Sequence, residues 1–105
     1  MLVPTGYVNQ AQLGDIIAQA AKNLGREVAH VAYGLGPDST GEPSLFFRIL
    51  LADAYIREDT IADLKSRIAA ALFDAIQPIE NWGLRPYFDF RSRSEQDRRP
   101  DPHWI

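Results

Sequence analysis

Two stretches of the chain repeat apolar residues at the spacing of an α-helix. In the first, residues 9–24, one stripe with a period of about 3.6 residues is formed by Leu13, Ile16, Ile17, Ala20, Ala21 and Leu24. Asn9 precedes this stripe as a suitable N-cap, and Gly25 follows it where a C-cap belongs. The pattern predicts a first helix over residues 9–24.

The second helical stripe lies in residues 60–76. Its apolar members are Ile61, Leu64, Ile68, Leu72, Ala75 and Ile76. Thr60 and Asp63 have the spacing of a capping box, which favours a helix start at this point. Gln77 and Pro78 end the pattern, because proline cannot continue a helix.

Three other segments predict β-strands. Residues 27–35 and 44–52 are rich in β-branched, aromatic and aliphatic side chains, and residues 85–91 read RPYFDFR. The third segment enters through a proline, which is tolerated best on an edge strand. Between the first two lies GLGPDSTGEP, residues 34–43, which predicts a ten-residue connection. Hairpin loops usually take about 2 to 5 residues, so this length suggests a functional loop.

The resulting order is helix, strand, strand, helix, strand. It predicts an α+β fold, a two-layer sandwich with two helices on one face of a small mixed sheet. A further short strand at residues 2–8 would complete a ferredoxin-like order, and without it the order resembles half of a KH domain. Neither analogy implies a function. We expect one α+β domain over residues 1–91 and a polar C-terminal tail over residues 92–105. The tail begins as an ordered segment, and its end is either a loose terminus or a short docking peptide anchored by Trp104 and Ile105.

The second strand is apolar on both of its faces. Successive side chains of a strand point to opposite faces, and one parity here carries Leu45, Phe47, Ile49 and Leu51. The other parity carries Phe46, Arg48, Leu50 and Ala52. A single layer of helices covers one face only, so the outer face needs another cover. We expect a homodimer through this face; the alternatives are another protein or the returning tail with Trp104.

Composition and charge exclude several classes of protein. The chain has no cysteine, which rules out disulfides, thiolate metal ligands and a cysteine nucleophile. Its net charge is −3, and residues 36–83 carry four cations against eight anions, which disfavours a surface that follows nucleic-acid phosphates. The start of the chain has no signal-type pattern, and its apolar runs are too short to cross a membrane. We therefore expect a cytoplasmic location.

The connection at residues 34–43 is the first candidate site. Asp38, Ser39, Thr40 and Glu42 offer oxygen atoms on a backbone rich in glycine and proline. Ca²⁺ or Mg²⁺ would suit such oxygens, but the spacing matches no known cation loop, and no metal site is predicted. Two interpretations remain. The loop is a structured turn in which Asp38 and Ser39 bond to their own backbone, or it contacts a protein or a small ligand.

Polar residues on the strands form the second candidate site. In one interpretation Arg48 and Arg91 hold an anionic ligand beside Tyr87. In the other, which we favour, Arg48 and Asp89 form an internal ion pair, because a buried charge without a partner is costly. The segment YFDFRSR also places arginines, including Arg93, among aromatic residues, which weakly suggests single-stranded nucleic acid.

The chain shows no catalytic constellation. No serine lies in a nucleophile motif, and one histidine in the predicted fold cannot form a relay. We predict no cofactor and regard enzymatic activity as the less favoured interpretation. Trp104 is a candidate docking residue in the tail, since tryptophan and arginine dominate the energetics of protein interfaces.

The preferred functional hypothesis is a small protein-interaction or regulatory module, dimeric, with a possible further protein partner. The alternative is a nucleic-acid or anionic-ligand binding domain that uses the strand-end arginines.

Overall fold

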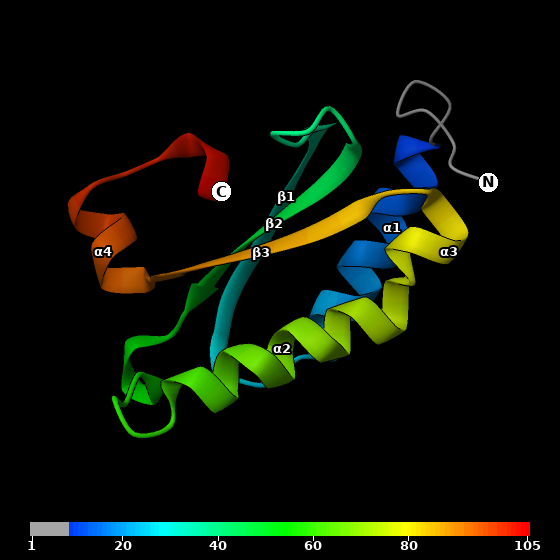
Figure 1. The fold of residues 1–105 in the computed structure, drawn as a ribbon. Helices are drawn as coiled ribbons and strands as arrows, with labels where there is room; N and C mark the ends of the chain where they lie inside the picture. Colours follow the sequence, from blue (N-terminus) through cyan, green and yellow to red (C-terminus); the bar gives the residue numbers. More distant parts are fainter. Residues whose placement is uncertain (1–8) are drawn as a thin grey trace.

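The computed structural model of the chain describes residues 9–105 and consists of a three-stranded sheet with helices packed on it (Figure 1). The short 3-10 helices are labelled η. The elements are α1 (Gln10–Lys22), β1 (Val28–Pro37), β2 (Pro43–Leu51), η2 (Asp53–Tyr55), α2 (Ile61–Ile76), α3 (Pro78–Trp82), β3 (Arg85–Ser92), α4 (Arg93–Arg98) and η3 (Pro102–Trp104).

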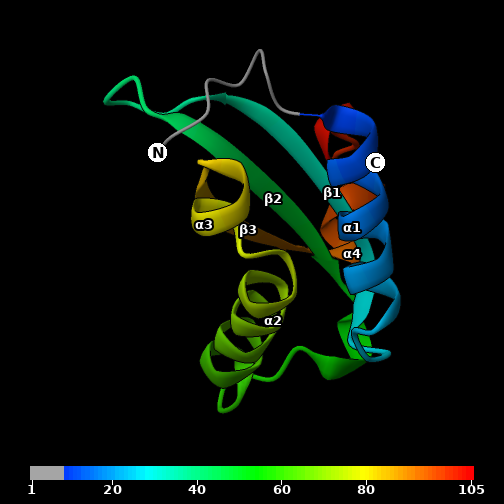
Figure 2. The ribbon, with the colours of Figure 1, turned by 90° about the vertical axis from the view of Figure 1, so that its right-hand side faces the viewer.

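The sheet has the strand order β1-β2-β3, with β2 in the centre. β1 and β2 are antiparallel and form a long twisted hairpin, whereas β2 and β3 are parallel (Figure 2). α2 and α3 connect the two parallel strands, as such a crossover requires. The predicted α+β fold with a mixed sheet is thus confirmed. The strand expected at residues 2–8, on which a ferredoxin-like order depends, lies outside the described residues.

The core lies between α1, α2 and the inner face of the sheet. Every second residue of β2 enters it, and four of them are at most 2% exposed: Leu45, Phe47, Ile49 and Leu51. The helices contribute the stripes that the sequence predicts, among them Leu13, Ile17, Leu64, Ile68, Leu72 and Ile76. Phe88 of β3 stacks on Phe47, with 5.0 Å between ring centroids. Burying these side chains is the main stabilising contribution, at roughly 1.5 to 3 kcal/mol each.

The helix ends agree with the sequence only in part. Asn9 is the N-cap of α1, because its side-chain oxygen accepts a hydrogen bond from the Gln12 amide at 3.0 Å. The expected cap at Gly25 is wrong, since α1 already ends at Lys22 and Asn23 is its C-cap. The capping box at Thr60 is also wrong, because the Thr60 side chain makes no capping bond.

The sequence did not predict α3. Gln77 adopts a left-handed conformation, with φ of 50°, and so ends α2 without ending helical structure. Pro78 then occupies the first position of α3, where its missing N–H costs nothing. Gly83, also left-handed, ends α3 and turns the chain into β3.

The connection between β1 and β2 is shorter than predicted. β1 continues through its glycines to Pro37, which pairs with Pro43 at the base of the turn. Five residues therefore connect the strands instead of ten. This is an ordinary hairpin length, so the argument from loop length for a functional loop at residues 34–43 is wrong.

The tail lies on the outer face of the sheet, on the opposite side from α2 (Figure 1). Its elements α4 and η3 contact β1, β2 and β3, so of the two interpretations of the tail the loose terminus is wrong. Leu50, which points to the outer face, is 3% exposed because the tail covers it. Of the three covers considered for this face, the returning tail is the one seen in the structure.

Candidate functional site on the outer face

Asp38 holds the tip of the β1–β2 hairpin together. Its Oδ1 atom accepts hydrogen bonds from the Thr40 amide at 2.9 Å, the Thr40 hydroxyl at 2.7 Å and the Glu42 amide at 3.0 Å. Its Oδ2 atom accepts from the Tyr87 hydroxyl at 2.7 Å and lies 3.5 Å from Nη1 of Arg85. The Asp38 side chain is only 4% exposed. The interpretation of this loop as a turn that bonds to its own backbone therefore describes Asp38 well.

These contacts perturb two ionisable groups. The hydrogen bonds from Thr40 and Tyr87 stabilise the carboxylate and hold the pKa of Asp38 well below its ordinary value. Donating to that carboxylate raises the pKa of Tyr87 above its ordinary value. Ser39 is exposed at the tip, and the main-chain carbonyl of Glu42 accepts from the Ser44 hydroxyl at 2.8 Å.

Beside the tail, the outer face exposes a cluster that we name the aromatic strip: Phe46 and Arg48 of β2 with Tyr87 and Asp89 of β3. Phe46 and Tyr87 are paired in register and stack, with 5.3 Å between ring centroids. Tyr87 is 40% exposed although its hydroxyl is fixed by Asp38. The ring is thus held in place before anything binds to it.

Arg48 and Asp89 are neighbours in register but do not form the expected ion pair. Within residues 9–105, no nitrogen of Arg48 lies within 4.0 Å of the Asp89 carboxylate. The guanidinium of Arg48 instead lies over Gly34 of β1, where a methyl group in place of the glycine hydrogen would have its carbon 3.0 Å from Nη1. The absence of a side chain at Gly34 gives Arg48 this position, and both charges of the strip remain partly or fully exposed.

Arg91 anchors the tail to the sheet. Its side chain, 13% exposed, donates to the Gln96 side chain, to the Arg99 carbonyl at 2.6 Å and to the Glu95 carbonyl at 3.4 Å. Gln96 is buried and donates to the Asp101 carbonyl at 2.9 Å. Arg91 and Gln96 therefore bind main-chain carbonyls after α4 and fix the path of the tail.

The arginines that the sequence suggested for an anionic ligand have separate neighbours. Arg91 binds the tail, Arg48 lies over Gly34, and Arg93 pairs with Asp97 at 3.4 Å on α4. They do not converge on one position.

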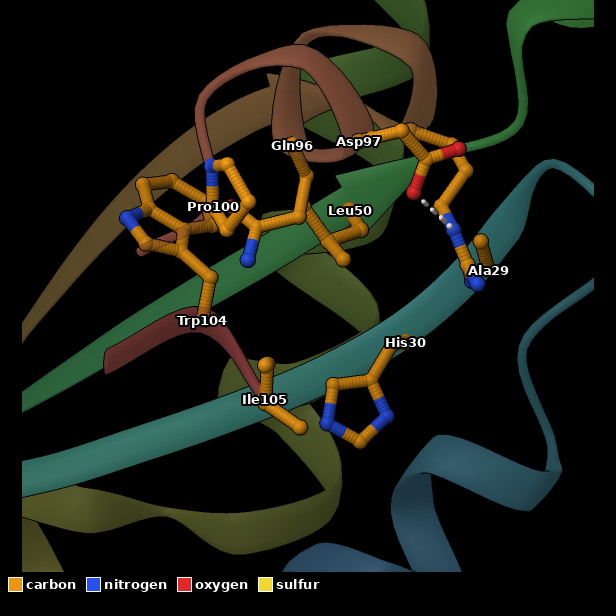
Figure 3. A pocket seen from close by; sticks show the side chains of 9 residues that line it. Ala29, His30, Leu50, Gln96, Asp97, Pro100, Trp104 and Ile105 are labelled. Atoms are coloured by element: carbon orange, nitrogen blue, oxygen red, sulfur yellow. Dashed lines mark hydrogen bonds and ion pairs between the residues drawn. The ribbon is translucent and has the colours of Figure 1, made fainter. Parts of the chain in front are cut away.

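The tail and the sheet border a cavity of about 450 Å³ that is open to solvent on one side (Figure 3). Leu50 lies at its back, and Pro100, Trp104 and Ile105 of the tail form its apolar wall. Ala29 and His30 border it from β1, and Arg93 and Asp97 border it from α4. Such a volume lies within the range of small-molecule sites.

The sequence pointed to Trp104, Arg93 and Leu50 separately, but not to the cavity that they form with Gln96, Asp97 and Pro100. A signal was present: Ser92 and Glu95 have the spacing of a capping box, and the Ser92 hydroxyl accepts from the Glu95 amide at 3.1 Å. Asp53 adds a second cap by accepting from the Ser94 amide at 2.9 Å. The Ser94 side chain first, and this amide second, hold the pKa of Asp53 below its ordinary value. The spacing of Ser92 and Glu95 predicts that a helix starts in the tail, which is the helix α4 that packs on the sheet.

Comparisons with protein-family models, curated proteins and solved structures found no significant match. Among the helices of residues 9–105, none has the length and apolar character needed to span a bilayer. In the same part of the chain, no three histidine, aspartate or glutamate residues are grouped as a metal site would require.

Proposed function

We propose that this chain is a protein-interaction module that works as a weak homodimer, with the aromatic strip as its docking surface. The observation that carries the proposal is the fixed Tyr87 ring, stacked on Phe46 and exposed to solvent beside Arg48. Tyrosine and arginine contribute strongly to interface energy, and a ring that is already ordered loses little entropy when a partner binds.

The shape of the outer face favours a second copy as the partner. The tail contacts this face around Leu50, and the aromatic strip lies nearer the other ends of β2 and β3. A two-fold axis running across the strands would place the tail of each copy beside the strip of the other. In that arrangement the two contacts between a tail and a strip are identical, as a two-fold dimer requires. Ile105, which is 78% exposed, can then contact the partner.

The strip also carries charges of both signs, Arg48 and Asp89, which suits contact with an identical surface. The alternative, a nucleic-acid or anionic-ligand binding domain, needs Arg48, Arg91 and Arg93 to face one ligand. Their separate neighbours and the net charge of −3 make this the weaker proposal.

Sedimentation velocity from low micromolar to near-millimolar concentration tests the dimer. We expect the mass to rise from 11.8 kDa toward twice that value. Tyr87→Ala should weaken the dimer about tenfold, because it removes the central ring. Tyr55→Ala is the matched control, since Tyr55 is 42% exposed but lies outside the strip. A monomer at every concentration, or an equal effect of both substitutions, would contradict the proposal.

A further inference from the structure

The cavity between the tail and the sheet combines an apolar body with a charged rim. Leu50, Pro100 and Trp104 offer apolar surface on several sides, with Trp104 presenting a flat ring (Figure 3). At the opening, Arg93 and Asp97 lie one helical turn apart, with 3.4 Å between Nε and Oδ1. Their side chains are 56% and 66% exposed, so both charges are accessible to a ligand.

This rim presents a cation and an anion side by side. A ligand with a single charge would be attracted to one group and repelled by the other. A ligand that carries adjacent charges of both signs can pair with both groups, its anion with Arg93 and its cation with Asp97. The ion pair between Arg93 and Asp97 is solvent-exposed and therefore weak, so a ligand can replace it at little cost.

From these observations we infer that the cavity binds a free amino acid with a large apolar or aromatic side chain. The side chain would contact Trp104 and Leu50, the α-carboxylate would pair with Arg93, and the α-ammonium group with Asp97. The volume of about 450 Å³ suits such a molecule. No residue of the aromatic strip lines this cavity, but the tail that forms its wall also contacts the partner in the proposed dimer. Binding is therefore measured at a protein concentration at which sedimentation velocity shows a monomer.

Two-dimensional NMR with L-phenylalanine as the probe tests the inference, and the chain supplies an internal control. The protein has two tryptophans. The indole N–H signal of Trp104 should shift with added L-phenylalanine. That of Trp82 should not, since it packs against the core beneath the inner face of the sheet. We expect the shift to reach half of its maximum at about 0.1 to 1 mM L-phenylalanine, as for a small ligand with few contacts.

Two analogues test the paired charges. Phenethylamine lacks the carboxylate and phenylpropionate lacks the ammonium group, and each should bind about tenfold more weakly than L-phenylalanine. Asp97→Asn should weaken L-phenylalanine by a similar factor but strengthen phenylpropionate, because it removes the repulsion between Asp97 and the carboxylate of that probe. Equal binding of all three probes would overturn the inference, because it would indicate apolar contact alone.

Filling the cavity gives a second, independent test. Ala29→Trp introduces a large ring from an exposed position of β1 and should abolish the Trp104 shift. Ala71→Trp, on the exposed side of α2, is the control and should leave binding unchanged. No Trp104 shift in the wild-type protein at saturating L-phenylalanine, or full binding by Ala29→Trp, would overturn the inference.

Discussion

Asp38 links the hairpin tip to β3 through one buried carboxylate. Its Oδ1 atom organises the five-residue turn, and its Oδ2 atom positions Tyr87 in the aromatic strip. A residue that the sequence offered as a ligand for a partner thus acts on the strip through its own hydrogen bonds. The local turn and the proposed docking surface depend on the same side chain.

The lowered pKa of Asp38 predicts how stability changes in acid. A carboxyl group whose pKa is lower in the folded state stabilises the fold above its unfolded pKa, about 3.9, and this contribution is lost as the pH falls further. Asp38→Asn removes the titrating group. We therefore expect urea unfolding to show a clear advantage of the wild type at neutral pH, which shrinks as the pH falls from about 5 to about 2. A difference between the two proteins that stays constant with pH would contradict this explanation.

At the scale of elements, α2 and α4 begin differently although both show capping patterns. The Ser92 hydroxyl accepts from the Glu95 amide, whereas Thr60 makes no capping bond with its side chain. Ser92→Ala should therefore lower the free energy of unfolding by about 1 kcal/mol, and Thr60→Ala should change it by less than about 0.3 kcal/mol. Chemical denaturation of both variants measures the difference. Equal losses would show that the geometry of the two caps does not decide their contribution.

The order of the main elements was predictable because their apolar periods are strong. Residues 9–24 and 60–76 carry helical stripes, and the alternation around Phe47 fixes which face of β2 is buried. The end of β1 was not predictable in the same way. Gly34 and Gly36 favour a loop by local preference, but pairing with β2 over this stretch keeps them extended.

The candidate site was less predictable than the fold, since it depends on contacts between distant residues. The bond from Tyr87 to Asp38 joins residues 49 positions apart, and the tail is held to β3 because Arg91 donates to the main-chain carbonyl of Arg99. Arg48 shows the limit most clearly. Its neighbour in register on β3 is Asp89, but its guanidinium lies in the space above Gly34 of β1 instead.

At the scale of the whole molecule, the two faces of the sheet are covered in different ways. The inner face carries the core, whose fully buried members come from α1, α2 and the sheet, with Leu84 just before β3. The outer face is covered in part by a tail that depends on the hydrogen bonds of Arg91 and Gln96 and on a few apolar contacts. The tail, the cavity beneath it and the strip beside it therefore belong to the less stable layer.

This asymmetry predicts that the tail opens while the core stays folded. In native-state hydrogen exchange with added urea, amides of α4 should exchange through an opening of low free energy and weak urea dependence, and amides of β2 through global unfolding.

Arg91→Gln removes hydrogen bonds of a charged group from the native state alone. This substitution should lower the opening free energy of α4 and the global unfolding free energy of β2 equally, by about 1.5 to 3 kcal/mol. The exposed control Arg57→Gln should change either by less than about 0.5 kcal/mol, because its pair with Asp59 is on the surface. If α4 and β2 exchanged with the same free energy and the same urea dependence, the tail would be part of one cooperative unit with the core, and a separate opening of the cavity would be excluded.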